Sequence, residues 1–157
     1  MQTFDIFINI PFAVTPAQGI DEGLLTGVSP AKKRAYVDAL LTEIEGFSDE
    51  SYAWDIRSLT LGGGTISSLS AEDFRRLMLG IKRWLPLTPE TPVFATADPG
   101  GLTVGHTNEL RACGQPQLVM RYFTSDVREA DVLGVRSPEA EMGKTDILFD
   151  QAGITNL

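Results

Sequence analysis

The sequence predicts an α/β fold in which repeated βα units form a parallel sheet. Short apolar runs of strand length alternate with longer segments whose apolar residues recur at helical spacing. Glycine-rich turns separate several of these segments, and capping residues precede the clearest helices. Successive strands joined through a helix form right-handed crossovers and lie parallel. We therefore expect residues 1–157 to fold as a single domain of four to five βα units.

The first predicted strand is an apolar run near the start of the chain, with Phe4, Ile6, Ile8 and Ile10 at alternate positions. Because the intervening residues are also partly apolar, the pattern suits a strand that is covered on both faces. Residues 11–28 then change to a mixture of Ala, Thr, Gly, Pro and Gln without a sustained period, which predicts a long loop. A loop of this length usually has a functional reason.

Two helices follow with clear start signals. Ser29 and Pro30 supply an N-cap and a first-turn proline, and Ser70 and Asp73 resemble a capping box. The first helix carries one apolar stripe at Tyr36, Val37, Leu40, Leu41 and Ile44, and the second carries one at Phe74, Leu77, Met78, Ile81 and Trp84. Between them, a strand over 56–61 leads into Gly62, Gly63, Gly64 and Thr65.

The remaining segments continue the alternation. We expect strands over 92–97 and 117–122, helices over 103–113, 126–133 and 137–152, and the start of a fifth strand at 154–157. Four and a fraction units fall short of a closed eight-fold barrel, so the expected architecture is a partial TIM-like barrel. Its open edge, around 117–122 and 154–157, predicts a homodimer or a protein partner, unless the helix over 137–152 covers it.

Composition excludes some classes of partner. The formal net charge of -8 disfavours nucleic acid and anionic lipid. The basic cluster Lys32, Lys33 and Arg34 is interpreted as a solvated helix face. The chain opens without a signal-peptide pattern and has no apolar run long enough to cross a bilayer, so no membrane association and a cytoplasmic location are expected.

Candidate catalytic side chains are few. Cys113 is the only cysteine, which excludes an internal disulfide, and it is expected to be a buried apolar residue. His106, the only histidine, is expected to be exposed, and no nucleophile can be matched to it. Residues 62–65 follow a strand and precede a helix, so their N–H groups could bind a carboxylate or phosphate, or the glycines could simply form a tight turn.

Several segments, in order and spacing, resemble landmarks of the oxygen-independent coproporphyrinogen III oxidase group of radical S-adenosylmethionine enzymes. These landmarks lie at 6–12, 36–44, 61–65 and 97–100. The resemblance implies the N-terminal part of a radical enzyme barrel, with a C-x3-C-x2-C loop after the first strand that binds an iron–sulfur cluster. It also implies that Gly62, Gly63, Gly64 and Thr65 contact the amino-acid end of S-adenosylmethionine.

The chain departs from this pattern at the cluster. The three cysteine positions fall on Ala13, Ala17 and Ile20, and the acid of the family's Glu-x-Asn-Pro motif falls on Thr96. We therefore expect no iron–sulfur cluster, no metal site and no catalytic residues, while binding of S-adenosylmethionine at 62–65 stays open.

The function expected from the resemblance is that of a catalytically inactive, cluster-less relative. It would act as a binding or assembly module for a tetrapyrrole, an S-adenosylmethionine-like ligand or a protein partner. Two alternatives remain: a half-site subunit of a radical enzyme of porphyrin metabolism that another chain completes, and a structural remnant that forms a homodimer.

Overall fold

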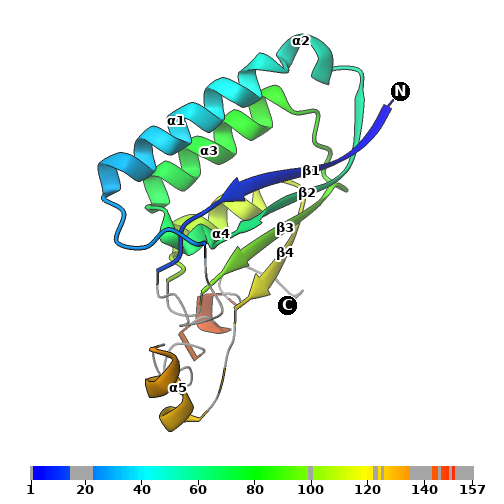
Figure 1. Cartoon of the computed structure of the whole chain (residues 1–157). Helices are drawn as coiled ribbons and strands as arrows, with labels where there is room; N and C mark the ends of the chain where they lie inside the picture. Colours follow the sequence, from blue (N-terminus) through cyan, green and yellow to red (C-terminus); the bar gives the residue numbers. More distant parts are fainter. Residues whose placement is uncertain are drawn as a thin grey trace.

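The computed structural model describes residues 2–14, 23–98, 101–121, 124, 126–134, 143–144, 146–148 and 150. Its elements alternate as the sequence predicts (Figure 1). In chain order they are β1 (Gln2–Ile10), α1 (Pro30–Gly46), α2 (Ser48–Ser51), β2 (Trp54–Gly63), the 3-10 helix η1 (Ile66–Ser68), α3 (Ala71–Trp84), β3 (Pro92–Ala97), α4 (Val104–Arg111), β4 (Gln115–Met120) and α5 (Val127–Leu133).

The four strands form one parallel sheet in the order β1-β2-β3-β4. Spatial order therefore follows chain order, as successive βα units of a barrel require. Helices α1, α3 and α4 lie together on one side of this sheet (Figure 1). The prediction of an α/β fold with parallel strands is confirmed.

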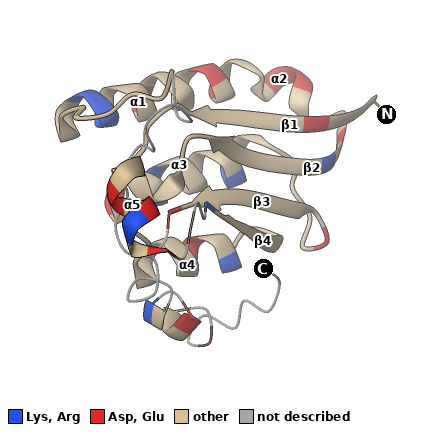
Figure 2. Ribbon diagram, turned by 60° about the horizontal axis from the view of Figure 1, so that its bottom comes forward, with Lys and Arg blue, Asp and Glu red and all other residues tan. Residues whose placement is uncertain are grey.

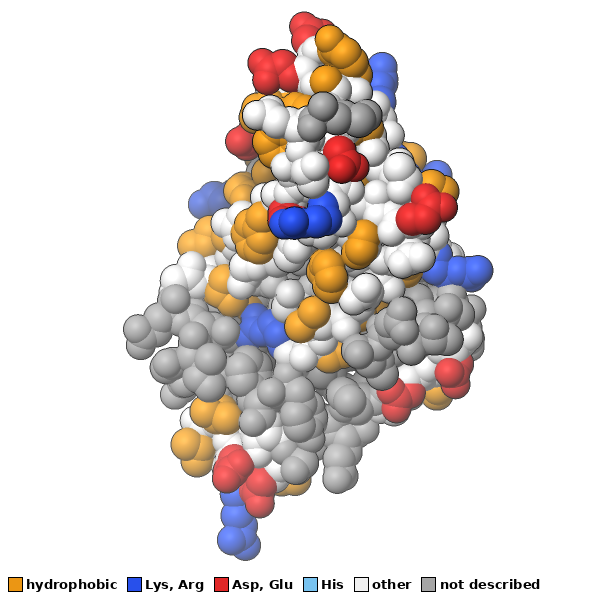
Figure 3. Space-filling model, turned by 90° about the vertical axis from the view of Figure 1, so that its right-hand side faces the viewer, with side chains coloured by type: hydrophobic (Ala, Val, Ile, Leu, Met, Phe, Trp, Pro, Cys, Tyr) orange, Lys and Arg blue, Asp and Glu red, His pale blue; other side chains and the backbone are white. Residues whose placement is uncertain are grey.

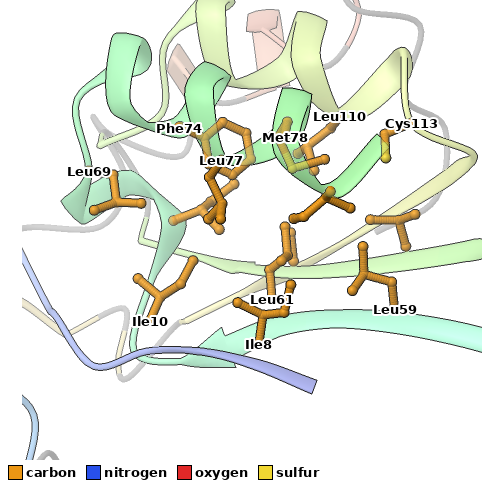
Figure 4. Packing of buried hydrophobic residues seen from close by; sticks show 14 of the residues in the cluster. Ile8, Ile10, Leu59, Leu61, Leu69, Phe74, Leu77, Met78, Leu110 and Cys113 are labelled. Atoms are coloured by element: carbon orange, nitrogen blue, oxygen red, sulfur yellow. The ribbon is translucent and has the colours of Figure 1, made fainter. Parts of the chain in front are cut away.

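The hydrophobic core lies between the sheet and its helices. Alternate residues of the strands point toward α3, so Ile8 and Leu61 meet Phe74 and Leu77 in a single apolar layer (Figure 4). Leu61, Phe74 and Leu77 are completely buried. The helical stripe predicted for α3 is thus the face that packs on the sheet.

The expectation that β1 is covered on both faces is wrong. Ile8 and Ile10 are buried, but Phe7 is 62% exposed, and Asp5 and Asn9 are exposed as well. Successive side chains of a strand point to opposite faces, and the described helices cover one face of the sheet. The apolar character of Phe7 therefore does not indicate burial.

The basic cluster at the start of α1 (Figure 2) is only partly a solvated face. Lys32 is exposed, but the Lys33 Nζ atom donates to the Ser68 carbonyl oxygen at 2.7 Å and Arg34 Nε donates to Asp73 Oδ1 at 2.9 Å. Burial raises the pKa of Asp73, but hydrogen bonds from Ser70 and Arg34 outweigh it, so the pKa lies below its ordinary value. Two of the three cations thus also bind η1 and α3, while Lys32 is exposed and the Arg34 side chain stays 50% exposed.

The later elements agree with the sequence where they are described. The fourth strand begins two residues before the predicted 117, and Asp126 caps α5 by accepting from the N–H groups of Arg128 and Glu129. Of the helix predicted over 137–152, only 143–144, 146–148 and 150 are described, and residues 154–157 lie outside the described chain. No described helix is both long and apolar enough to cross a bilayer.

Candidate functional site

The candidate site lies where β2 and β3 end, at the carboxyl edge of the sheet. Ligands of parallel α/β folds bind at this edge, because loops that follow several strands converge there. The glycine turn, residues 62–65, follows β2, and Asp98 follows β3 directly. The end of β1 approaches the same turn through Ile10 and Phe12.

Two positions of the turn require glycine, Gly63 because of its positive φ and Gly64 because of close packing against the β1 backbone. Gly63 has a φ of +92°, and a Cβ there would lie 2.0 Å from Asn9 Oδ1. A Cβ on Gly64 would lie 2.1 Å from the carbonyl oxygen of Phe12. A Cβ on Gly62, in contrast, would make ordinary contacts of 3.4 Å or more. The local fold alone therefore explains two of the three glycines.

Two N–H groups of the turn are used within the fold. Gly64 N donates to Ile10 O at 2.7 Å, and Thr65 N donates to Phe12 O at 2.9 Å. These groups extend the pairing between β1 and β2 and do not point at a ligand. Of the two interpretations of residues 62–65, this geometry supports the tight turn, and S-adenosylmethionine binding there stays a prediction.

A buried polar network joins the ends of three strands. The Thr65 hydroxyl donates to Asp98 Oδ2 at 2.8 Å, and Arg121 Nε lies 3.6 Å from Asp98 Oδ1. The backbone N–H of Asp98 donates to Ser67 Oγ at 3.0 Å. Thr65 is fully buried, and the Asp98 and Arg121 side chains are each 12% exposed. This Thr65–Asp98–Arg121 network brings a carboxylate and a guanidinium together at the edge of the sheet where ligands of this fold bind.

The predicted cluster loop offers no ligand where it is described. Ala13 is buried, and its N–H donates to the Leu25 carbonyl oxygen at 3.3 Å, so only a methyl group stands at the first ligand position. Ala17 and Ile20 lie outside the described residues, and their side chains carry no donor atom. Within the described chain, no group of three His, Cys, Asp or Glu residues could hold a metal ion. These residues do not fit a cysteine-bound iron–sulfur cluster.

Thr96 takes the place of the acid that the resemblance implies. It lies on the open face of the sheet, and its Oγ1 atom would be 3.6 Å from a Cβ on Gly62. A neutral hydroxyl cannot form the ion pair that a carboxylate would form with a cationic ligand.

The expectation that His106 is exposed is wrong, because the histidine is 1% exposed and belongs to the N-terminal cap of α4. Its Nδ1 atom accepts from the Thr103 N–H at 3.3 Å, so the proton lies on Nε2, which is 3.1 Å from the Leu69 carbonyl oxygen. Burial lowers the pKa of His106, although the backbone carbonyls of Leu69 and Ile66 raise it. The residue is a neutral structural histidine.

Cys113 is 2% exposed, which confirms the expected buried position. Burial raises the pKa of its thiol to about 11. A thiol with so high a pKa is a poor nucleophile and a poor metal ligand near neutral pH.

The whole described fold matches a known structure. Coproporphyrinogen III oxidase (HemN) from Escherichia coli, described as a radical SAM enzyme, superposes with a TM-score of 0.83 over 98% of this chain at 20% identity. The chain has the fold of the N-terminal part of a radical S-adenosylmethionine barrel. The resemblance inferred from the sequence is confirmed, and the partial barrel spans 35% of that solved chain.

A curated protein is similar in sequence to part of the chain. Anaerobilin synthase from Escherichia coli O157:H7 is 32% identical over 92 residues, which are 56% of this chain and 20% of that protein. No family model matches the chain. The chain therefore spans about a third or less of the length of each of these two proteins.

Sequence reasoning missed the buried contact between Asp98 and Arg121 at this site. The sequence pattern assigns no role to Asp98 or Arg121, and their pairing follows from the register in which Ala97 lies beside Met120. Each comes directly after one of two neighbouring parallel strands. That shared position is the signal that could have predicted the pair.

Proposed function

We propose that this protein is a catalytically inactive, cluster-less relative of the coproporphyrinogen III oxidase group that acts as a binding or assembly module. The observation that carries the proposal is the side chain at the first cluster-ligand position, the buried methyl group of Ala13. A four-iron cluster needs thiolate ligands, and the chain has a single cysteine, which is buried elsewhere.

The polar network at the strand ends supports the same proposal. Asp98 and Arg121 neutralise each other beside Thr65, so the charges at this edge already have partners within the chain. A site that retained S-adenosylmethionine would need charged groups directed at the ligand. Thr96 also lacks the carboxylate that the resemblance implies.

The rival proposal is a half-site that a second polypeptide completes with its own cluster. The half-site proposal differs from the cluster-less module in one measurable respect. Its partner polypeptide would have to bring the cluster thiolates to the carboxyl edge of this sheet. A homodimer in which this chain is a structural remnant is the second rival, and light scattering at micromolar concentration tests it.

Anaerobic reconstitution tests the central proposal. The purified protein is incubated with iron, sulfide and a thiol reductant, desalted, and assayed for bound iron and for visible absorbance. Active coproporphyrinogen III oxidase treated in parallel is the positive control. We expect no stoichiometric iron, whereas about four irons per chain with a cluster absorbance band would contradict the proposal.

A triple variant and a ligand panel complete the test. Ala13→Cys, Ala17→Cys and Ile20→Cys together restore the thiolate pattern, so iron uptake by this variant alone would attribute the loss to these three positions. Melting of the unmodified protein is then compared with and without S-adenosylmethionine and a soluble porphyrin. A ligand-dependent rise without metal supports a small-molecule module, and an unchanged melting temperature is expected both for protein assembly and for a structural remnant.

A further inference from the structure

An apolar groove of about 330 Å³ lies between β1 and α1. Ile8 and Ile44 contribute buried apolar surface to it, while Phe47 and Trp54 form part of its wall with ring centroids 5.6 Å apart. Phe7 is also among the lining residues, but its side chain points to the opposite face of β1 from Ile8, whereas Phe47, which packs on Trp54, is 43% exposed. Aromatic side chains that remain this accessible are typical of protein contact surfaces.

The backbone of β1 faces this groove. β1 pairs with β2 on one side, and no other described strand pairs with β1. Ile10 O accepts from Gly64 N, so the peptide groups of Ile10 face β2. Because these groups alternate along a parallel strand, those of Phe7 and Asn9 face away from β2. The Tyr36 hydroxyl, which donates to Asn9 O at 2.9 Å, agrees with that direction.

The charges at the groove have one sign. Glu43 lines it, and Asp49 and Glu50 line an adjoining hollow that shares Trp54. All three acids are exposed, and no Lys or Arg is among the described residues that line either hollow. Acidic and hydrophobic side chains occur together at the top of Figure 3, where α2 lies, with a Lys or Arg side chain at the margin of this region. A second copy, with a net charge of -8, would bring like charge to this surface.

We propose that the groove between β1 and α1 is the docking site of an extended protein segment that presents both apolar and basic side chains on its groove-facing side. Its backbone pairs with the outward peptide groups near Phe7, its apolar side chains enter the groove, and Lys or Arg residues on the same side of the segment approach Glu43 and the acids of α2. Strand addition to an open edge provides affinity through the main chain and specificity through alternate side chains. This inference rests on the assembly role within the proposed function, to which it gives a surface and a class of partner.

A synthetic peptide tests this proposal with the full-length chain. The probe is an acetylated and amidated peptide of about nine residues with Thr at every second position and with Val and Lys in turn at the others, so that Val and Lys lie on one side of the strand. The matched peptide has Glu in place of Lys. Calorimetry should give an affinity for the Lys peptide at least about tenfold higher than for the Glu peptide, decreasing as salt is added. Amide NMR signals of β1 residues should shift during the titration.

Two charge-reversal variants locate the contact. Glu43→Lys should weaken binding of the Lys peptide about tenfold, because it places a cation at the groove. Glu45→Lys changes the net charge equally at an exposed position of α1 that does not line the groove, and it should change affinity less than about twofold. Equal weakening by the two variants would show unspecific attraction and overturn the proposal.

Two further outcomes would also overturn it. The first is an absence of binding, and the second is protection of the Phe7 amide from hydrogen exchange before any peptide is added. Protection would mean that the edge is already covered by another segment of the chain or by a second copy, and light scattering distinguishes these. None of these results depends on iron, so failure of the docking proposal leaves the reconstitution experiment to decide the cluster-less assignment separately.

Discussion

The hydroxyl of Thr65 and the carboxylate of Asp98 are joined by a buried hydrogen bond of 2.8 Å. Thr65 belongs to the turn after β2, and Asp98 follows β3, so this bond fixes the ends of two neighbouring strands relative to each other. A carboxylate that is largely removed from water needs such donors, because its desolvation is otherwise uncompensated.

Thr65→Val should therefore lower the free energy of unfolding by about 1–3 kcal/mol, because it keeps the shape of the side chain and removes one donor to a buried carboxylate. Urea denaturation followed by circular dichroism measures the change. Thr26→Val, at an exposed position, is the control and should have little effect. Equal stability of the two variants would show that Asp98 does not depend on Thr65.

Gly64→Ala should destabilise the fold by about 1–3 kcal/mol, because the added Cβ meets backbone atoms that cannot rotate away. That Cβ would lie 2.1 Å from Phe12 O and 2.6 Å from Ile10 O. Gly46→Ala is the matched control, since a Cβ there meets nothing within 4 Å. A thermal melt of each variant compares them, and a Gly64→Ala protein as stable as Gly46→Ala would contradict the described turn.

Acidification should destabilise the protein through His106. The pKa of this histidine is lowered in the folded state from an ordinary value of 6.5, so the unfolded chain takes up the proton first. Stability is then fully present above pH 6.5 and is lost as the pH falls from there toward the folded-state pKa. Urea midpoints at about pH 7.5 and about pH 5.5 should differ in that direction.

His106→Gln identifies the source of this pH dependence. Gln keeps an amide donor that can reach toward the Leu69 carbonyl oxygen, but it does not titrate. The variant should be less stable than the unmodified protein at the higher pH, with a smaller difference between the two pH values. An unchanged pH dependence would assign the effect to other groups.

The Cys113 thiol should react with an aromatic disulfide reagent only when the protein opens. It is 2% exposed, and burial raises its pKa to about 11, so both access and the thiolate fraction limit the reaction. Labelling followed by absorbance should be slow without denaturant and should accelerate through the unfolding transition. Rapid labelling of the native protein would place the thiol at the surface.

The regular spacing of apolar residues along the sequence explains why much of the fold could be predicted. The stripe from Phe74 to Trp84 and the cap at Ser70 locate α3, and the apolar run at 92–97 coincides with β3. These signals are local, so the sequence carries them without knowledge of partners. The covering of β1 was mispredicted because Phe7 is apolar yet lies on the face that the described helices leave open.

The site was harder to predict because it depends on contacts between distant segments. Asp98 and Arg121 pair only through the register of β3 and β4, which hydrophobic period does not specify. His106 lies in a short helix with a weak apolar pattern, so its burial depends on the tertiary position of α4 against Leu69. The loss of the three cysteines, in contrast, could be predicted from the sequence alone. Once the resemblance aligns the motif, its ligand positions fall on Ala13, Ala17 and Ile20.

The 3-10 helix η1 links α1 to the end of β3 through hydrogen bonds. Its Ser68 carbonyl oxygen accepts from Lys33 of α1, and its Ser67 hydroxyl oxygen accepts from the backbone of Asp98 after β3. Neither α1 nor the end of β3 can move away without breaking a bond to the same three-residue segment. Residues 30–46, 66–68 and 92–98 should therefore exchange their amide hydrogens as one cooperative unit, so that loosening one of them exposes the others on the same timescale.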